Sequence, residues 1–463
     1  MLLSKSVGFI WVVGIAALLW GTTMLAQNQA GGAVPASATV EDRLPKDVYP
    51  DSRNRLPLPK REDMDDYGKK VFDEWATGLQ LASINRAPLR LYSPKLAEPM
   101  GAAHHYVKYE TALGIRLTEV AVLVATRETD CQFEWTNWEI HGRSPGDPRY
   151  IEPGIVDIVK YDQPVAGLGE KETVIINFGR ELFDQRKVSS ETFAHALRLF
   201  GPRGVVDLTE LMALYSQTAA ELNAFDMQLQ PGQKPLLPPR PFNLECPAHP
   251  LAQTPGSADA ALPKDVYPDS RNRLPLPKRE DMDDYGKQVF DKLSKGPGYT
   301  PALRFYSPKL AESMSAAHYY LKFGTGLPDR LVEIAVLVTA REMANQYEWT
   351  QWENFGRKRG DPRQIEPAII DVIKYDQPVV GLGEKETVVI EFGRELFGRR
   401  RVSSETFAHV LRLFGRRGTV DLTELMAMYG ATGVELDAFD QQLLVGQKPL
   451  LPPHTVPGHC IHP

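Results

Sequence analysis

The distribution of apolar residues predicts a helical protein with one unusually apolar helix in each half of the chain. Residues 119–143, EVAVLVATRETDCQFEWTNWEIHGR, begin with apolar helix formers and end in a cluster of Glu, Trp and amide side chains. Residues 333–357, EIAVLVTAREMANQYEWTQWENFGR, repeat this pattern almost entirely. A helix that is apolar all round is buried, so its polar groups need partners inside the protein. Both segments are therefore the first place to look for chemistry.

The polar side chains of the first segment gather on one face if its helix continues unbroken to residue 141. At about 100° per residue, roughly one third of the circumference then carries Glu119, His141, Glu134, Arg127, Trp138 and Cys131. The pattern predicts a stripe of reactive groups that points into an interior space, which a small molecule can enter.

Capping and breaking signals predict the neighbouring helices. Ser93 with Pro94 at the first helical position is typical of a helix start and predicts a helix through residue 109. Gly and Pro residues after residue 142 end the apolar helix, and another helix is expected over residues 153–161. Residues 171–183 combine the β-branched TVIIN with flanking sequences that favour a helix.

Two further signals predict the last helices of the first half. Ser189 with Thr192 opens a helix through residue 200. Asp207 with Glu210 resembles a capping box and predicts a separate, long helix that ends near residue 229. No strand pairing with turn signals is visible, so we expect an all-α fold class.

The chain contains an internal sequence repeat. LPKDVYPDSRNRLPLPKREDMDDYGK occurs from residue 44 and again, unchanged, from residue 262. KYDQPV, GLGEKETV, VSSETFAH and VDLTELMA also recur, which indicates two duplicated helical bundles rather than a solenoid. The predicted domains are a signal peptide or anchor over 1–30, a spacer over 31–48, a first domain over 49–230, a Pro-rich linker over 231–261, a second domain over 262–448 and a tail over 449–463.

The N-terminal segment predicts export. Lys5 precedes an apolar run over residues 7–20, and small residues follow around Ala26. Cleavage after this run would release a periplasmic or secreted protein, while an uncleaved segment over residues 7–26 would anchor the chain in a membrane. The formal net charge of −6 gives no reason to expect nucleic acid as a partner.

The three cysteines are too few for a disulfide scaffold. Cys246 and Cys460 occupy matching places near the ends of the two repeats, so in an oxidising compartment they either pair with each other or remain exposed thiols. Cys131 has no counterpart, because the second repeat carries Asn345 at that place.

The order of helices, with VAVLVA leading into FEW, resembles the carboxymuconolactone decarboxylase and AhpD-like family. The resemblance extends through VSSETFAHALRLFG and VDLTELMALYSQTAAELNAFDMQL and covers both repeats. It implies an extended, tandem form of that helical fold. It also implies either lyase chemistry on a small organic acid or lactone, or a peroxidase activity.

The family's peroxidase motif combines a Glu, two Cys and a His. It falls on Glu119, Cys131, Glu134 and Trp138 in the first repeat and on Glu333, Asn345, Glu348 and Trp352 in the second. The second Cys and the His are thus missing in both copies. The decarboxylase-like branch has Glu-Trp in place of the second Cys, and here Glu134 with Trp135 and Glu348 with Trp349 match it.

Acid–base chemistry is the preferred reading of the buried Glu and Arg residues. Desolvation raises the pKa of a buried carboxyl, which suits Glu119 and Glu134 to proton transfer. Arg127 can bind a substrate carboxylate through two hydrogen bonds, and His141 can replace the missing family His. The second repeat offers Glu333, Arg341 and Glu348 for the same roles. The competing interpretation is a buried ion-pair network that holds the helices in register.

Other residues add alternatives. Cys131 beside Arg127 could attack a peroxide, although a buried cysteine more often acts as a small hydrophobe. Trp and His side chains that recur in both repeats line a pocket or belong to the core: Trp135, Trp138, His104, Trp349, Trp352 and His318. No spacing typical of a metal site occurs, and no cofactor is expected.

The expected partner is a small-molecule ligand or substrate. We also expect the two repeats to pair within the chain, and a homo-oligomer is left open. A non-catalytic binding or scaffold protein is the alternative from another class, because the family His is lost.

Overall fold

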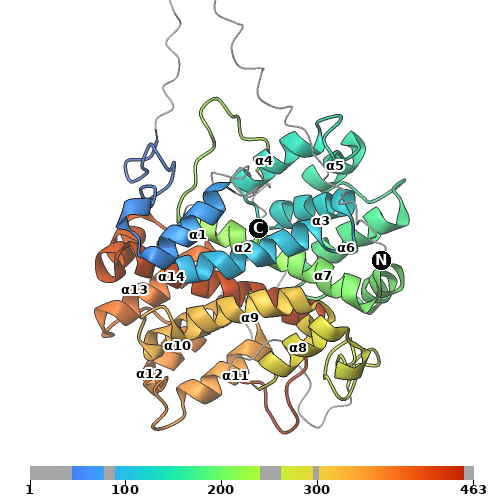
Figure 1. Ribbon diagram of the computed structural model, residues 1–463. Helices are drawn as coiled ribbons and strands as arrows, with labels where there is room; N and C mark the ends of the chain where they lie inside the picture. Colours follow the sequence, from blue (N-terminus) through green and yellow to red (C-terminus); the bar gives the residue numbers. More distant parts are fainter. Residues whose placement is uncertain (1–43, 78–88, 240–261, 296–301, 453–463) are drawn as a thin grey trace, which may run out of the picture. The chain divides into compact units, whose positions relative to one another are not determined.

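The computed structural model describes residues 44–77, 89–239, 262–295 and 302–452 (Figure 1). These residues form helices and loops without a β-strand, and one isolated bridge joins Tyr49 and Asn54. The predicted all-α fold class is confirmed. The predicted signal peptide, Cys246 and Cys460 lie outside the described residues, as does most of the predicted linker. No described helix is long and apolar enough to cross a membrane.

The two repeats contain the same helices in the same order. The first repeat consists of α1 (Asp66–Thr77), α2 (Pro94–Tyr109), α3 (Ile115–Glu128), α4 (Gln132–Gly142), α5 (Pro153–Lys160), α6 (Glu170–Asp184) and α7 (Ser190–Ala224). The second consists of α8 (Asp284–Leu293), α9 (Pro308–Phe323), α10 (Asp329–Glu342), α11 (Gln346–Gly356), α12 (Pro367–Lys374), α13 (Glu384–Gly393) and α14 (Ser404–Ala438). The uncertain segment over residues 171–183 is therefore helical, and the helix expected over 153–161 is confirmed.

The predicted unbroken helix over residues 119–141 is wrong. The chain leaves the helix after α3, where Asp130 adopts a left-handed φ of 53°, and α4 begins a new helix with Cys131 as its N-cap. The second repeat breaks at the same place, with Ala344 at φ 48°. Because α4 starts in a new direction, residues 119–127 and 131–141 do not share one helical face.

The last helix of each repeat begins earlier than its sequence suggested. Ser189 caps α7 as predicted and accepts a hydrogen bond from the backbone of Thr192. The helix then bends at Gly201 (φ 68°) and continues from there to Ala224. The predicted capping box is wrong, because Asp207 lies inside the helix and is fully buried.

Asp207 instead takes part in contacts between the repeats. Its Oδ1 accepts a hydrogen bond from Ser307, the residue that precedes α9. In the matching contact, Ser93 donates to Asp421 of α14 rather than capping its own helix α2. Helices α7 and α14 pack against each other, as do α2 and α9, which lie side by side in Figure 1.

Two buried arginine clusters cross the same contact. Arg90 binds Glu424 of the other repeat at 2.6 Å and Glu221 of its own repeat at 2.8 Å. The matching Arg304 binds Glu210 at 2.5 Å and Glu435 at 2.8 Å. All six side chains of the two clusters are at most 7% exposed: Arg90, Glu221, Glu424, Arg304, Glu210 and Glu435. Each guanidinium therefore serves two buried carboxyl groups.

Candidate functional site

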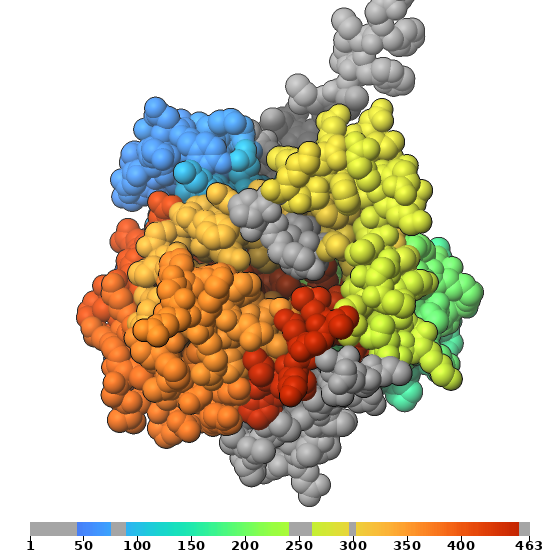
Figure 2. Space-filling view, turned by 90° about the horizontal axis from the view of Figure 1, so that it is seen from below, coloured from blue at the N-terminus to red at the C-terminus, as the bar shows by residue number. Residues whose placement is uncertain are grey.

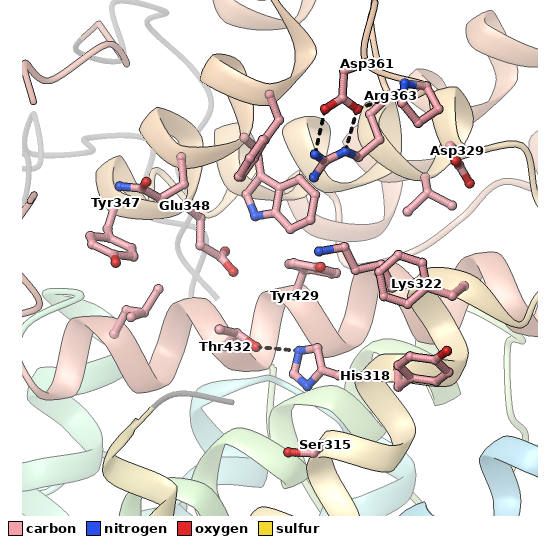
Figure 3. Close-up of a pocket in the computed structure, with 18 of the residues that line it drawn as sticks. Ser315, His318, Lys322, Asp329, Tyr347, Glu348, Asp361, Arg363, Tyr429 and Thr432 are labelled. Atoms are coloured by element: carbon pink, nitrogen blue, oxygen red, sulfur yellow. Dashed lines mark hydrogen bonds and ion pairs between the residues drawn. The ribbon is translucent and has the colours of Figure 1, made fainter. Parts of the chain in front are cut away.

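A cavity of about 680 Å³ lies within the second repeat (Figure 3). Its walls come from α9, α10, α11 and α14 and from the loop between α11 and α12. The lining side chains that carry the argument are His318, Lys322, Glu348, Trp352, Phe355, Arg363, Tyr429 and Thr432. This volume falls in the range of small-molecule sites, which is about 300–1,000 Å³.

Aromatic rings form much of the cavity wall. The ring of Trp352 meets Tyr429 edge-to-face at 5.2 Å between centroids and Phe355 at 5.9 Å. Tyr429 also meets His318 at 5.7 Å. Edge-to-face packing of this kind holds the rings in fixed orientations, so the apolar wall is already formed without a ligand.

Glu348 is a buried carboxyl group at this wall. It lies in the first turn of α11 and is 3% exposed, and its Oε2 atom accepts no hydrogen bond from the described residues. Burial raises the pKa of Glu348 well above its ordinary value, Asp437 raises it further, and Arg304 opposes the shift. The environment therefore favours the protonated form of this carboxyl group, the form that can donate a proton.

Glu333 is a second buried carboxyl group, on α10 next to Val332, which lines the cavity. It is fully buried, and burial raises its pKa to about 8 against the opposing charges of Arg363 and Lys322. Burial raises the pKa of Tyr429, and the negative charges that Glu348 and Glu333 would carry once ionised add to the shift. Glu348 and Tyr429 at the cavity wall, and Glu333 near it, thus favour their neutral forms.

Two cations reach the cavity, and their environments differ. Arg363 donates through Nε and Nη2 to Asp361, both at 2.9 Å, and lies over the ring of Phe355 at 4.1 Å. Lys322 lies over the ring of Trp352 at 4.7 Å and forms no ion pair with a described carboxylate. Burial lowers the pKa of Lys322, and Arg363 contributes to that shift.

His318 is a neutral part of the wall. Its Nε2 lies 3.3 Å from the hydroxyl of Thr432. Burial lowers the pKa of His318 to about 3, and the charge of Arg304 adds to the effect. The imidazole therefore accepts or donates hydrogen bonds without carrying charge at physiological pH.

The first repeat places the matching residues in a different arrangement. Trp138 donates from Nε1 to Glu134 at 2.5 Å, whereas no such bond joins the described side chains of Trp352 and Glu348. His141 stands where the second repeat has Phe355. It is partly exposed, and its Nδ1 lies 2.7 Å from Nη2 of Arg149. Burial is the main cause that lowers the pKa of His141.

The structure does not bring the predicted arginines to the cavity. Arg127 binds Asp162 at 2.9 Å and the carbonyl of Pro238 at 3.1 Å, and Arg341 binds the carbonyl of Pro452 at 3.2 Å. Both therefore hold the segment that follows the last helix of their repeat. Figure 2 shows the segment after α14, in red, beside the orange part of the second repeat. The predicted single stripe of Glu, Arg and Cys is wrong, because the break after α3 and α10 separates its members.

Several other predicted residues belong to the core. Trp135 and Trp349 are fully buried and donate to Glu139 at 2.6 Å and to Glu353 at 2.5 Å, respectively. Cys131 is fully buried, and the described part of the chain contains no other cysteine. Glu119 is likewise buried, within α3.

The remaining predicted pocket residues divide between the repeats. His318 and Trp352 line the cavity of the second repeat. In the first repeat, His104 lies near Tyr215 at 6.1 Å between ring centroids, and Trp138 meets the same tyrosine at 5.7 Å. The two histidines and the two tryptophans therefore have matching aromatic neighbours.

Sequence reasoning missed Lys322, Arg363 and Tyr429. A usable signal existed, because Lys108, Arg149 and Tyr215 recur at the matching positions of the first repeat. Within the described ranges, no three His, Cys, Asp or Glu side chains are grouped as a metal site.

Comparison with known proteins does not identify the chain. No family model matches it, and no curated protein matches it significantly.

Proposed function

We propose that the second repeat binds a small organic acid or lactone and that Glu348 acts on it as a general acid. The observation that carries this proposal is the buried carboxyl group of Glu348 at the wall of a ligand-sized cavity, where its Oε2 accepts no hydrogen bond from the described residues. A buried carboxyl group whose surroundings favour its protonated form is suited to donate a proton to a carbonyl or lactone oxygen.

The charges near Glu348 support this role. Proton transfer to the substrate leaves a carboxylate, and the positive charge of Arg304 favours that form. Lys322 supplies an ammonium group for a substrate carboxylate in the same cavity. In this proposal the chain is an exported relative of the carboxymuconolactone decarboxylase and AhpD-like family. Its active site lies in the second repeat, where Glu348 and Trp349 match the Glu-Trp pair of that family's decarboxylase-like branch.

A non-catalytic binding protein is the second candidate. It is favoured by Trp352, which occupies the place of the family His and contributes an aromatic wall instead of a base. The peroxidase alternative has less support. Cys131 is fully buried, and the described residues contain no second thiol to resolve an oxidised cysteine.

The experiment compares Glu348→Gln with the matched variant Glu134→Gln. A panel of small carboxylic acids and lactones is screened with the full-length protein for thermal stabilisation and for conversion by mass spectrometry. General-acid chemistry predicts that Glu348→Gln lowers turnover about 100-fold or more, because general acid catalysis contributes about 10²–10⁴-fold, while Glu134→Gln retains it.

The outcomes separate the candidates. Equal turnover by Glu348→Gln and the parent protein would exclude the general-acid role. Ligand-induced stabilisation without conversion of any panel member would favour the binding protein. A screen in which no acid or lactone stabilises the protein would reject both.

A further inference from the structure

The cavity of the second repeat has a charge pattern that restricts the ligand. Arg363 is committed to Asp361 through two hydrogen bonds of 2.9 Å. Lys322 forms no such pair among the described side chains, so its ammonium group is available to a ligand. Because the lining carboxylates Asp329 and Asp361 would repel a second negative charge on the ligand, the pattern favours a monoanion over a dianion.

The position of the charge relative to the rings restricts the ligand further. Lys322 Nζ lies 4.7 Å from the centroid of Trp352, which in turn packs edge-to-face on Tyr429. Figure 3 shows Lys322 and Glu348 entering the same space from α9 and α11. A ligand carboxylate that binds Lys322 therefore places the body of the ligand against aromatic rings. A flat, aromatic body makes edge-to-face or stacked contacts that a saturated one lacks.

The volume indicates more than one ring. A cavity of about 150 Å³ is enough for benzene, whereas this cavity measures about 680 Å³. A single ring would leave most of the apolar wall in contact with water. A fused ring pair covers more of that wall while remaining flat.

We propose that this cavity takes a fused-ring aromatic monocarboxylate, whose carboxylate binds Lys322 and whose rings lie against Trp352 and Tyr429. This inference names the ligand class of the site proposed above and rests on that site being a binding site. An oxygen on the far ring would face Glu348, the proton donor of the proposed reaction.

The test uses 2-naphthoate as the probe and measures its affinity for the full-length protein by calorimetry. Three matched compounds separate the contributions: 2-naphthamide lacks the charge, cyclohexanecarboxylate lacks the aromatic rings, and naphthalene-2,6-dicarboxylate carries a second charge. We expect 2-naphthoate to bind about tenfold or more tightly than each of them. The amide cannot pair with the Lys322 ammonium as a carboxylate does, the saturated ring lacks the aromatic contacts, and the second carboxylate is buried without a counter-charge.

Variants test the assigned cation. Lys322→Met should weaken 2-naphthoate about tenfold or more and leave the affinity for 2-naphthamide nearly unchanged. Lys108→Met removes the matching lysine of the first repeat and should leave both affinities as in the parent protein. Lys322→Gln is the second variant, and circular dichroism checks that each variant is folded.

Two results would overturn the inference. One is equal affinity of the parent protein for 2-naphthoate and 2-naphthamide, a comparison that requires no variant. The other is a Lys322 variant that is folded and binds 2-naphthoate as the parent does. A third result separates this inference from the proposed function. If cyclohexanecarboxylate binds in a Glu348-dependent manner and 2-naphthoate does not bind, the ligand class is wrong and the proposed acid-binding function stands.

Discussion

The clearest physical prediction concerns Glu333, which is fully buried on α10 and has a pKa raised from 4.5 to about 8. Between these two pH values the folded protein keeps a proton on Glu333 that the unfolded chain has released. The native state then binds more protons than the unfolded state, so stability falls as the pH rises. The contribution is fully present below about pH 4.5 and is lost as the pH increases through 8.

The magnitude follows from the size of the shift. Each pH unit in this window costs about 1.4 kcal/mol, so the free energy of unfolding loses about 3 kcal/mol between pH 5 and pH 7 through this one group. Glu333→Gln keeps the size and shape of the protonated side chain but cannot titrate. The variant should therefore gain stability relative to the parent protein by about 1.4 kcal/mol per pH unit.

The assay is denaturant unfolding of both proteins at pH 5, 6 and 7, followed by tryptophan fluorescence. The difference between the two proteins at each pH removes the contributions of all other titrating groups that the substitution leaves unchanged. Glu405→Gln, at an exposed position in the first turn of α14, is the control for the substitution itself. A difference between Glu333→Gln and the parent that stays constant from pH 5 to pH 7 would refute the reasoning.

Three further predictions test the fold and the unused thiol. Arg304→Met should lower the free energy of unfolding by about 3–5 kcal/mol, because it leaves Glu210 and Glu435 buried without their cation; a loss below about 1 kcal/mol in denaturant unfolding would contradict this. Gly415 forms the bend of α14, with φ 68° and ψ 179°, a backbone conformation open essentially to glycine alone. Gly415→Ala should therefore lower the free energy of unfolding by about 1–3 kcal/mol in the same assay, and an unchanged midpoint would show that the bend relaxes. Cys131 is fully buried, so in a variant that keeps it as the sole cysteine a maleimide should react far more slowly with the folded than with the urea-unfolded protein. Equal rates would show that the thiol is accessible.

Most of the helical fold could be predicted from the sequence, because local signals and tertiary structure agree. Ser189 caps its helix as expected, and the helix that starts at Pro153 follows the rule for proline at the first helical position. The break after α3 was missed for a physical reason. Asp130 and Ala344 adopt left-handed backbone conformations without a glycine or proline to mark the place.

The same break decided which part of the site could be predicted. Glu348 and Trp352 lie on one short helix, so their spacing in the sequence already placed them together. Arg341 lies on α10, before the break, and binds the carbonyl of Pro452, a contact that no local pattern indicates. Lys322 and Tyr429 reach the cavity from α9 and α14, and only the packing of distant helices brings them near Glu348.

The two repeats also show why near-identical sequence segments do not imply equal function. Glu134 and Glu348 occupy matching positions, but the first accepts a hydrogen bond from Trp138 at 2.5 Å while Oε2 of the second has no partner among the described residues. The oxygen of Glu134 that accepts this bond has one acceptor site fewer for a ligand, whereas no described residue occupies Oε2 of Glu348. The asymmetry is therefore a physical reason to assign the proposed chemistry to the second repeat.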